Sequence, residues 1–187
     1  MAADHLKLYF LALIPPQALR TRVKRLKEDI RDRFGAKHAL KSPAHITLQM
    51  PFWWDEREEP RLLSTLGAAA AKEHAFHIEL DGFDSFAPRV IFVRIANPNS
   101  IITLHQRLLP TLRSTLDIPP PYRGDGLHPH MTIATRDLRK AAFHEARAHY
   151  RTAPFEASFS TSAIWLLKHS GKHWDMHQAL SFAPAMT

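Results

Sequence analysis

The sequence predicts an α+β fold in which the whole chain, residues 1–187, forms one bilobal domain with two pseudo-symmetric lobes around a central cleft. A first observation is that an apolar strand pattern followed by an amphipathic helix occurs twice. A second is that a tetrad of His, apolar, Thr, apolar also occurs twice, at His45–Leu48 and His130–Ile133. The third is a hydrophobic content of 45%, enough for a real core.

Strand and helix patterns alternate through the first half of the chain. The apolar run Leu6–Ile14 ends at two prolines and predicts a strand. Helical spacing predicts a helix over Gln17–Phe34, which Gly35 can end. The remaining expected elements are a strand carrying the first tetrad from Ala44 to about Phe52, a polar turn over Asp55–Glu59, a helix over Leu62–Glu73, and a strand over Phe76–Phe86 with a bulge at Asp81–Gly82.

The second half repeats this order. The expected elements are a strand over Val90–Ile95, a helix limited or kinked at Pro110, a loop over Ile118–Gly126, the second tetrad strand over Leu127–Thr135, a helix to about Arg151 that Asp137 can cap, and one or two strands within Phe155–Leu167. A turn at Ser170–Gly171 then leads to a strand over His173–Phe182 and predicts a C-terminal hairpin.

An internal repeat follows from these patterns. Leu8–Pro16 aligns with Val90–Pro98, and the two tetrads lie about 85 residues apart. Repeats of this size imply two similar units related by a pseudo-two-fold axis. Such an axis brings equivalent strands to face each other, so that two distant motifs can build one site.

The composition limits the function classes. A formal charge of +7 favours polyanionic partners, with nucleic acid first among them. The absence of cysteine excludes disulfides and thiol catalysis and suits a cytoplasmic location. No membrane span or cleavage pattern is expected, and we predict a monomer without membrane association. The basic side chains of Gln17–Phe34 could form an RNA face or a solvated helix surface; they are Arg20, Arg22, Lys24, Lys27, Arg31 and Arg33.

The paired tetrads carry the predicted chemistry. In a strand, alternate side chains share a face, so each histidine and its threonine point one way and their apolar neighbours point the other way. Two imidazoles and two hydroxyls in one cleft suit acid–base chemistry on a phosphate. With thirteen histidines, one His-x-Thr is expected by chance, but two copies at equivalent positions of a repeat are not. The alternative is a pair of half-buried structural histidines.

Other catalytic classes find less support. His128 and His130 can share a strand face, but no carboxylate accompanies them at metal-ligand spacing. There is no Gly-x-Ser-x-Gly elbow and no Gly-rich phosphate loop. We therefore expect no metal and no cofactor.

Paired His-x-Thr-apolar motifs in a duplicated domain resemble the 2H phosphoesterase superfamily. The run from Leu127 to Thr132 resembles the bacterial RNA 2′,3′-cyclic phosphodiesterases, also called 2′-5′ RNA ligases. The resemblance implies antiparallel sheets around the cleft with helices outside. It also implies that His45 and His130 are catalytic and that Thr47 and Thr132 bind the substrate phosphate.

The resemblance suggests further substrate-binding candidates. The family has an arginine shortly after the second motif, where this chain has Thr135 followed by Arg136. A shift of one residue along a strand reverses the face, which would turn Arg136 away from the cleft. The complete set of further candidates is Arg123, Arg136, Lys168, Lys172 and Trp174.

The activity implied is metal-independent hydrolysis of 2′,3′-cyclic phosphodiesters at RNA or nucleotide ends to 2′-phosphates, with reversible 2′-5′ ligation as the reverse reaction. The resemblance makes His45 the acid and His130 the base, an assignment that the sequence alone does not decide. Two alternatives stay open. The chain could act on another nucleotide, such as ADP-ribose cyclic phosphate or 2′-5′ oligoadenylate, or it could bind RNA ends without catalysis.

Overall fold

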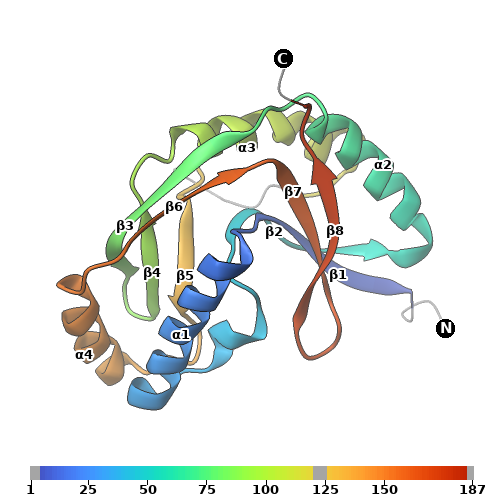
Figure 1. The fold of residues 1–187 in the computed structure, drawn as a ribbon. Helices are drawn as coiled ribbons and strands as arrows, with labels where there is room; N and C mark the ends of the chain where they lie inside the picture. Colours follow the sequence, from blue (N-terminus) through green and yellow to red (C-terminus); the bar gives the residue numbers. More distant parts are fainter. Residues whose placement is uncertain (1–4, 120–125, 185–187) are drawn as a thin grey trace.

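The computed structural model describes residues 5–119 and 126–184 (Figure 1). The elements, in chain order, are β1 (Leu6–Leu13), α1 (Gln17–Phe34), η1 (His38–Lys41), β2 (Ile46–Asp55), η2 (Glu56–Glu58), α2 (Glu59–Ala70), β3 (Phe76–Phe86), β4 (Val90–Ile95), α3 (Asn99–Pro110), η3 (Thr111–Thr115), β5 (His130–Ala134), α4 (Lys140–Arg151), β6 (Glu156–Thr161), β7 (Ala163–His169) and β8 (Trp174–Ser181).

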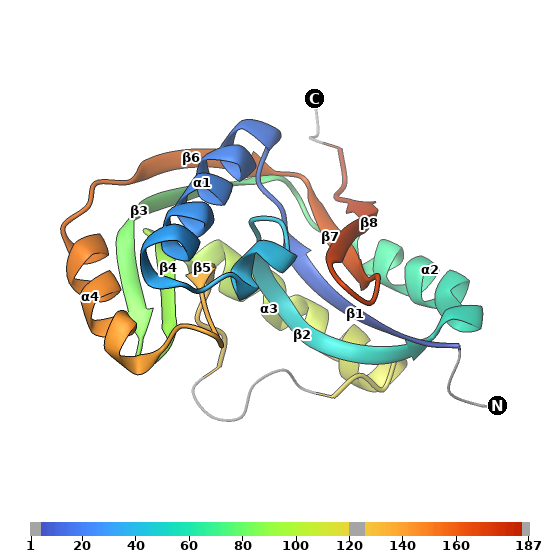
Figure 2. The ribbon, with the colours of Figure 1, turned by 90° about the horizontal axis from the view of Figure 1, so that it is seen from below.

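The strands form two four-stranded sheets in which every pairing is antiparallel. Sheet A has the order β2-β1-β7-β8, and sheet B has the order β5-β4-β3-β6. Helices α1 and α4 lie against sheet B, whereas α2 and α3 lie on the side of sheet A (Figures 1 and 2). The predicted duplicated, bilobal α+β fold is confirmed.

The two repeats exchange strands, β3 for β7. Each repeat pairs its first two strands with each other, β1 with β2 and β4 with β5. However, β3 of the first repeat pairs with β4 of the second. In return, β7, which follows β6 after a single residue, pairs with β1 of the first repeat. Each lobe therefore contains strands from both halves of the chain, a feature that the sequence repeat does not predict.

Several predicted elements have their predicted bounds. Helix α1 and strands β3 and β4 span the expected residues. Gly35 ends α1 with φ +75°, and its N–H donates to the Arg31 carbonyl. The predicted bulge is present because the pairing register shifts between Leu80 and Phe83, and Gly82 adopts φ +64°.

Two local predictions are wrong. Helix α2 begins at Glu59, earlier than predicted, because Pro60 is well suited to the first turn of a helix, and it ends at Ala70 rather than Glu73. Asp137 does not cap α4, which begins at Lys140 without a side-chain cap. Instead, Asp137 Oδ2 accepts the backbone N–H groups of Lys37 at 2.8 Å and His38 at 2.9 Å and fixes the start of η1.

The core runs through both lobes. One cluster of buried apolar residues includes Leu11 and Leu166 of sheet A and Val93 and Ile133 of sheet B. A smaller cluster covers the other face of sheet A; it consists of Phe10, Ala12, Ile14 and Leu167. Among the described helices, none is long and apolar enough to cross a membrane.

Candidate active site

The two tetrads meet at one cavity of about 530 Å³, which His45, Thr47, His130 and Thr132 all line. Their apolar neighbours point the other way: Ile46, Leu48, Met131 and Ile133 are completely buried. The alternation predicted for a strand therefore places both imidazoles and both hydroxyls on the cavity side.

Both histidines are oriented by the same local contact. His45 Nδ1 lies 2.8 Å from the Pro43 carbonyl oxygen, and His130 Nδ1 lies 2.6 Å from the His128 carbonyl oxygen. A carbonyl oxygen can only accept, so each Nδ1 carries a proton and donates it. Nε2 is thus the nitrogen of each ring that can exchange a proton with a ligand.

Each imidazole also packs against an equivalent phenylalanine. The Phe10 ring centroid lies 4.9 Å from that of His45, and the Phe92 centroid lies 5.0 Å from that of His130. Phe10 and Phe92 occupy matching positions in the repeat. The pseudo-symmetry therefore extends beyond the tetrads to the apolar surroundings of both rings.

The surroundings disfavour the charged form of both histidines. Burial and the nearby charge of Lys27 lower the pKa of His45 to about 4. Burial also lowers the pKa of His130 below its usual value. Both rings are therefore neutral at neutral pH. A bound phosphodiester anion would favour the protonated form of either ring, because an opposite charge nearby stabilises it.

Lys27 breaks the symmetry between the two histidines. Its side chain is 2% exposed, and Nζ donates to the carbonyl oxygens of Ser42 at 3.0 Å and Pro43 at 3.3 Å. Burial lowers the pKa of Lys27 to about 8. The grouping of Lys27 with the solvent-facing basic residues of α1 is therefore wrong. Its spacing from Val23 and Ile30, which puts it on the buried stripe, is the signal that could have revealed this.

Two of the further candidates reach the cavity. Trp174 lines it, and its ring centroid lies 4.6 Å from that of Phe10. Arg136 also lines it, contrary to the expected turn away from the cleft. Strand alternation does not apply to Arg136, because β5 ends at Ala134 and Arg136 has a left-handed φ of +43°.

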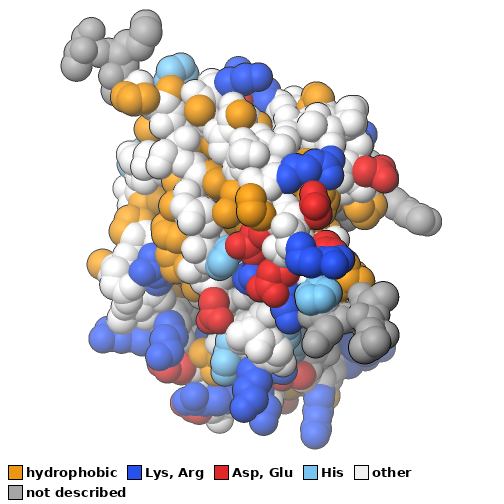
Figure 3. Space-filling view, turned by 90° about the vertical axis from the view of Figure 1, so that its right-hand side faces the viewer, with side chains coloured by type: hydrophobic (Ala, Val, Ile, Leu, Met, Phe, Trp, Pro, Cys, Tyr) orange, Lys and Arg blue, Asp and Glu red, His pale blue; other side chains and the backbone are white. Residues whose placement is uncertain are grey.

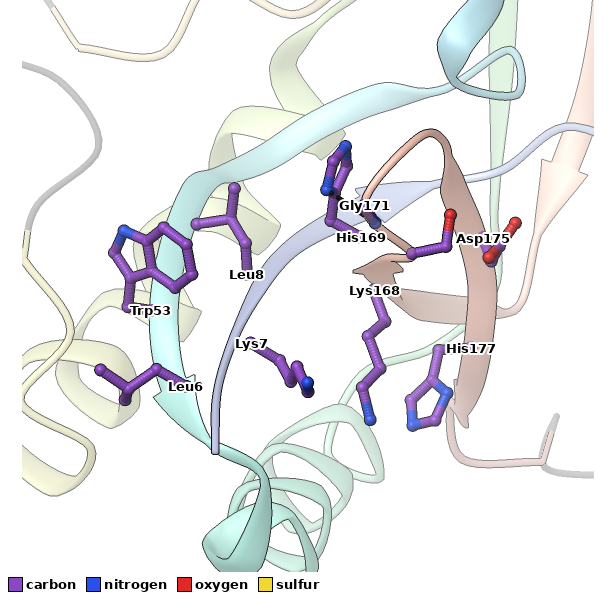
Figure 4. Close-up of a pocket in the computed structure, with 10 residues that line it drawn as sticks. Leu6, Lys7, Leu8, Trp53, Lys168, His169, Gly171, Asp175 and His177 are labelled. Carbon is purple, nitrogen blue, oxygen red and sulfur yellow. Dashed lines mark hydrogen bonds between the residues drawn. The ribbon is translucent and has the colours of Figure 1, made fainter. Parts of the chain in front are cut away.

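The other candidates are not brought to this cavity. Lys168 pairs with Tyr9 across the strands, so it points to the face of sheet A opposite Phe10, and its Nζ donates to Glu56 at 2.6 Å and Glu59 at 2.8 Å. It lines a separate cavity beside the start of β1 (Figure 4). Lys172 is exposed in the β7–β8 turn and does not line the active-site cavity. Arg123 lies outside the described residues.

The structure adds residues that sequence analysis missed. His38, Lys41 and Ser42 line the cavity from η1 and the residue after it, and Phe86 lines it from the end of β3. No motif marks them; closeness in sequence to the first tetrad was the available signal for the first three. Within the described residues, no group of three or more His, Cys, Asp or Glu side chains is placed to hold a metal ion.

Comparison with known proteins gives consistent sequence matches. A family model described as the 2′-5′ RNA ligase superfamily matches residues 15–173. A putative phosphoesterase of Bacillus pumilus (strain SAFR-032) is 28% identical over 130 residues, which cover 68% of this chain and 70% of the relative. A putative phosphoesterase of Geobacillus kaustophilus (strain HTA426) is 31% identical over 103 residues, 54% of this chain and 56% of the relative.

Solved structures share the fold. The chain is similar to E. coli LigT complexed with 3′-AMP, with a TM-score of 0.68 and 18% identity over 96% of this chain and 99% of that one. It is also similar to TT0787 of Thermus thermophilus, with a TM-score of 0.66 and 20% identity over 96% of this chain and 100% of that one.

Proposed function

The chain belongs to the 2′-5′ RNA ligase superfamily, and from this premise we propose that it hydrolyses 2′,3′-cyclic phosphodiesters at RNA or nucleotide ends to 2′-phosphates. The observation that carries the proposal is the pair of imidazoles in one cavity, each with Nδ1 committed to a carbonyl and Nε2 available. Paired groups of this kind suit a reaction that needs a base and an acid on opposite sides of one phosphorus atom.

The proposed reaction is an in-line displacement. Water attacks phosphorus while the bond to the ribose 3′ oxygen breaks, so one group removes a proton from water and the other protonates the leaving oxygen. We assign the base to His130 and the acid to His45. This assignment follows the family resemblance. The charge of Lys27 opposes it in the free protein, because that charge disfavours the His45 imidazolium.

The bound phosphate would complete this arrangement. Its negative charge would raise the pKa of His45 and load the acid only when substrate is present. The hydroxyls of Thr47 and Thr132 would donate hydrogen bonds to the non-bridging oxygens as charge develops on them. The protein residues supply every group in this scheme.

A nucleotide substrate is also supported by proteins of the same fold. E. coli LigT has been crystallised with 3′-AMP, NADP+ and ATP. In this chain Trp174 and Phe86 line the cavity and offer aromatic faces to a base. If an RNA 5′-hydroxyl replaces water, the reverse reaction joins two ends through a 2′-5′ linkage.

The experiment is hydrolysis of a nucleoside 2′,3′-cyclic phosphate by the purified protein in excess EDTA, with the product identified by phosphorus NMR. We expect a 2′-phosphate and expect His45→Ala and His130→Ala each to lower kcat by about 10²–10⁴-fold. His144→Ala, on the exposed face of α4, is the matched control. Circular dichroism checks that each variant folds.

Four outcomes would contradict parts of the proposal. Near-normal rates in both site variants would exclude the two-histidine site. Loss of activity in EDTA would exclude metal-independent hydrolysis. Retention of the cyclic phosphate without turnover would instead favour a protein that binds RNA ends, and turnover of only ADP-ribose cyclic phosphate or 2′-5′ oligoadenylate would change the substrate.

A further inference from the structure

A second cavity of about 310 Å³ adjoins the active-site cavity between α1, the stretch before β2 and the β7–β8 turn. We call it the basic groove and define it by Arg20, Lys24, Lys41, His173 and Trp174. Lys41, Ser42 and Trp174 line both cavities. The basic groove is therefore continuous with the site where the tetrads meet.

The lining of the basic groove is cationic. Arg20, Lys24 and Lys41 contribute positive charge, and the residues that line the groove include no carboxylate. Arg20 is held in place by hydrogen bonds to the Pro15 carbonyl and the Gln17 side chain. The Lys24 side chain is 68% exposed and only loosely paired, with Nζ 3.7 Å from Glu28. These groups remain available to an anion.

The cavity on the other side of the hairpin has a different character. Lys7 and Lys168 line it, but so does Asp175 (Figure 4). Lys168 is also paired with Glu56 and Glu59. On the molecular face that carries α2 and the start of β1, acidic and basic side chains lie next to one another (Figure 3). This cavity therefore carries less net positive charge than the basic groove and is the less favourable of the two for a polyanion.

We propose that the basic groove binds the phosphodiester backbone on the 5′ side of the cyclic phosphate, so that the substrate is the end of an RNA chain rather than a free nucleotide. This inference rests on the proposed function. A cyclic phosphate at a 3′ end leaves only the 5′ direction for the rest of the chain. Trp174, at the border of the two cavities, is placed to stack on a base between them.

The test compares kcat/KM for a tetraribonucleotide ending in a 2′,3′-cyclic phosphate with that for a nucleoside 2′,3′-cyclic phosphate, between about 50 and 200 mM salt. We expect the tetranucleotide to be preferred and the preference to fall as salt rises. Arg20→Ala and Lys24→Ala should each lower kcat/KM for the tetranucleotide about tenfold and reduce the logarithmic salt slope by about 0.7. In both variants the loss should be much larger for the tetranucleotide than for the nucleoside substrate.

Arg25→Ala is the control, because Arg25 is an exposed cation on the same helix and lies outside the groove. Equal effects of Lys24→Ala and Arg25→Ala would show attraction by net charge alone and overturn the proposal. Trp53 lines the cavity beside β1. If Trp53→Ala lowered kcat/KM for the tetranucleotide and the groove variants did not, the RNA would lie in that cavity, and the proposal would be overturned.

Failure of the proposed activity can be distinguished from failure of the proposed RNA binding in the basic groove. If no cyclic phosphate is turned over, fluorescence anisotropy with a labelled RNA ending in a 3′-phosphate still compares Lys24→Ala with Arg25→Ala. Weaker binding in Lys24→Ala alone supports the groove without the activity. Turnover of both substrates with no preference for the tetranucleotide refutes the groove and leaves the activity standing.

Discussion

Replacing Lys27 by methionine should raise the pKa of His45. The Pro43 carbonyl oxygen accepts from Lys27 Nζ at 3.3 Å and from His45 Nδ1 at 2.8 Å, so the two nitrogens lie within about 6 Å of each other. At an effective dielectric constant of about 20, two unit charges at that distance repel by about 2.8 kcal/mol, or about two pKa units. Burial is the larger cause of the lowered pKa and remains, so we expect a rise of about one to two units from the value of about 4.

Titration of the His45 ring protons by NMR measures this shift directly, and His45→Ala identifies the resonance. Lys27→Gln is a second variant that keeps a hydrogen-bond donor for the Ser42 and Pro43 carbonyls while removing the charge. Lys140→Met removes the same charge from the exposed start of α4 and should leave the pKa of His45 unchanged. An unchanged pKa in both folded Lys27 variants would refute the electrostatic link.

Further predictions concern pH and stability. The kcat/KM for a cyclic phosphate should peak below pH 6.5. The rate falls at low pH because the base is protonated, and it falls at higher pH because the acid loses its proton. Both histidine pKa values are lowered, so an optimum above pH 7 would contradict this prediction. Tyr150→Phe should cost about 1–2 kcal/mol in urea unfolding, because its hydroxyl donates to Asp29 Oδ2 at 2.6 Å and links α4 to α1. Gly35→Ala should destabilise by about 1 kcal/mol because of its φ of +75°, whereas Gly67→Ala inside α2 should stabilise by a similar amount; thermal unfolding of the pair tests both.

The elements and the tetrads were predictable because they depend on local periodicity. Helix α1 was found with both ends correct, since its apolar stripe and Gly35 mark it in the sequence alone. The pairing of His45 with Thr47, and of His130 with Thr132, follows from the two-residue period of a strand. The prediction that the two tetrads share one site also required the internal repeat, because a pseudo-two-fold axis brings equivalent strands together.

The features that were missed depend on contacts between distant segments. Lys168 lies opposite Tyr9, on the face of sheet A away from Phe10. Both faces of β7 carry buried apolar side chains, so alternation within β7 does not tell which face lies toward the cavity. Asp137 binds the backbone at Lys37 and His38, about 100 residues away in the chain. A capping prediction made from neighbouring residues alone could not find this partner. For Arg136 the cause is local: its left-handed backbone conformation ends the strand alternation from which its orientation is predicted.

The exchange of β3 and β7 between the two halves of the chain implies an order of assembly. Both histidines and both threonines of the tetrads have been synthesised once the ribosome passes Thr132, whereas only β1 and β2 of sheet A have been made by then. Its other two strands begin at Ala163, and the edge of β1 that they cover stays open until then. The wall of the cavity beside His45 that Trp174 supplies arrives last. A nascent chain therefore contains both histidines and both threonines before the cavity that they line is complete.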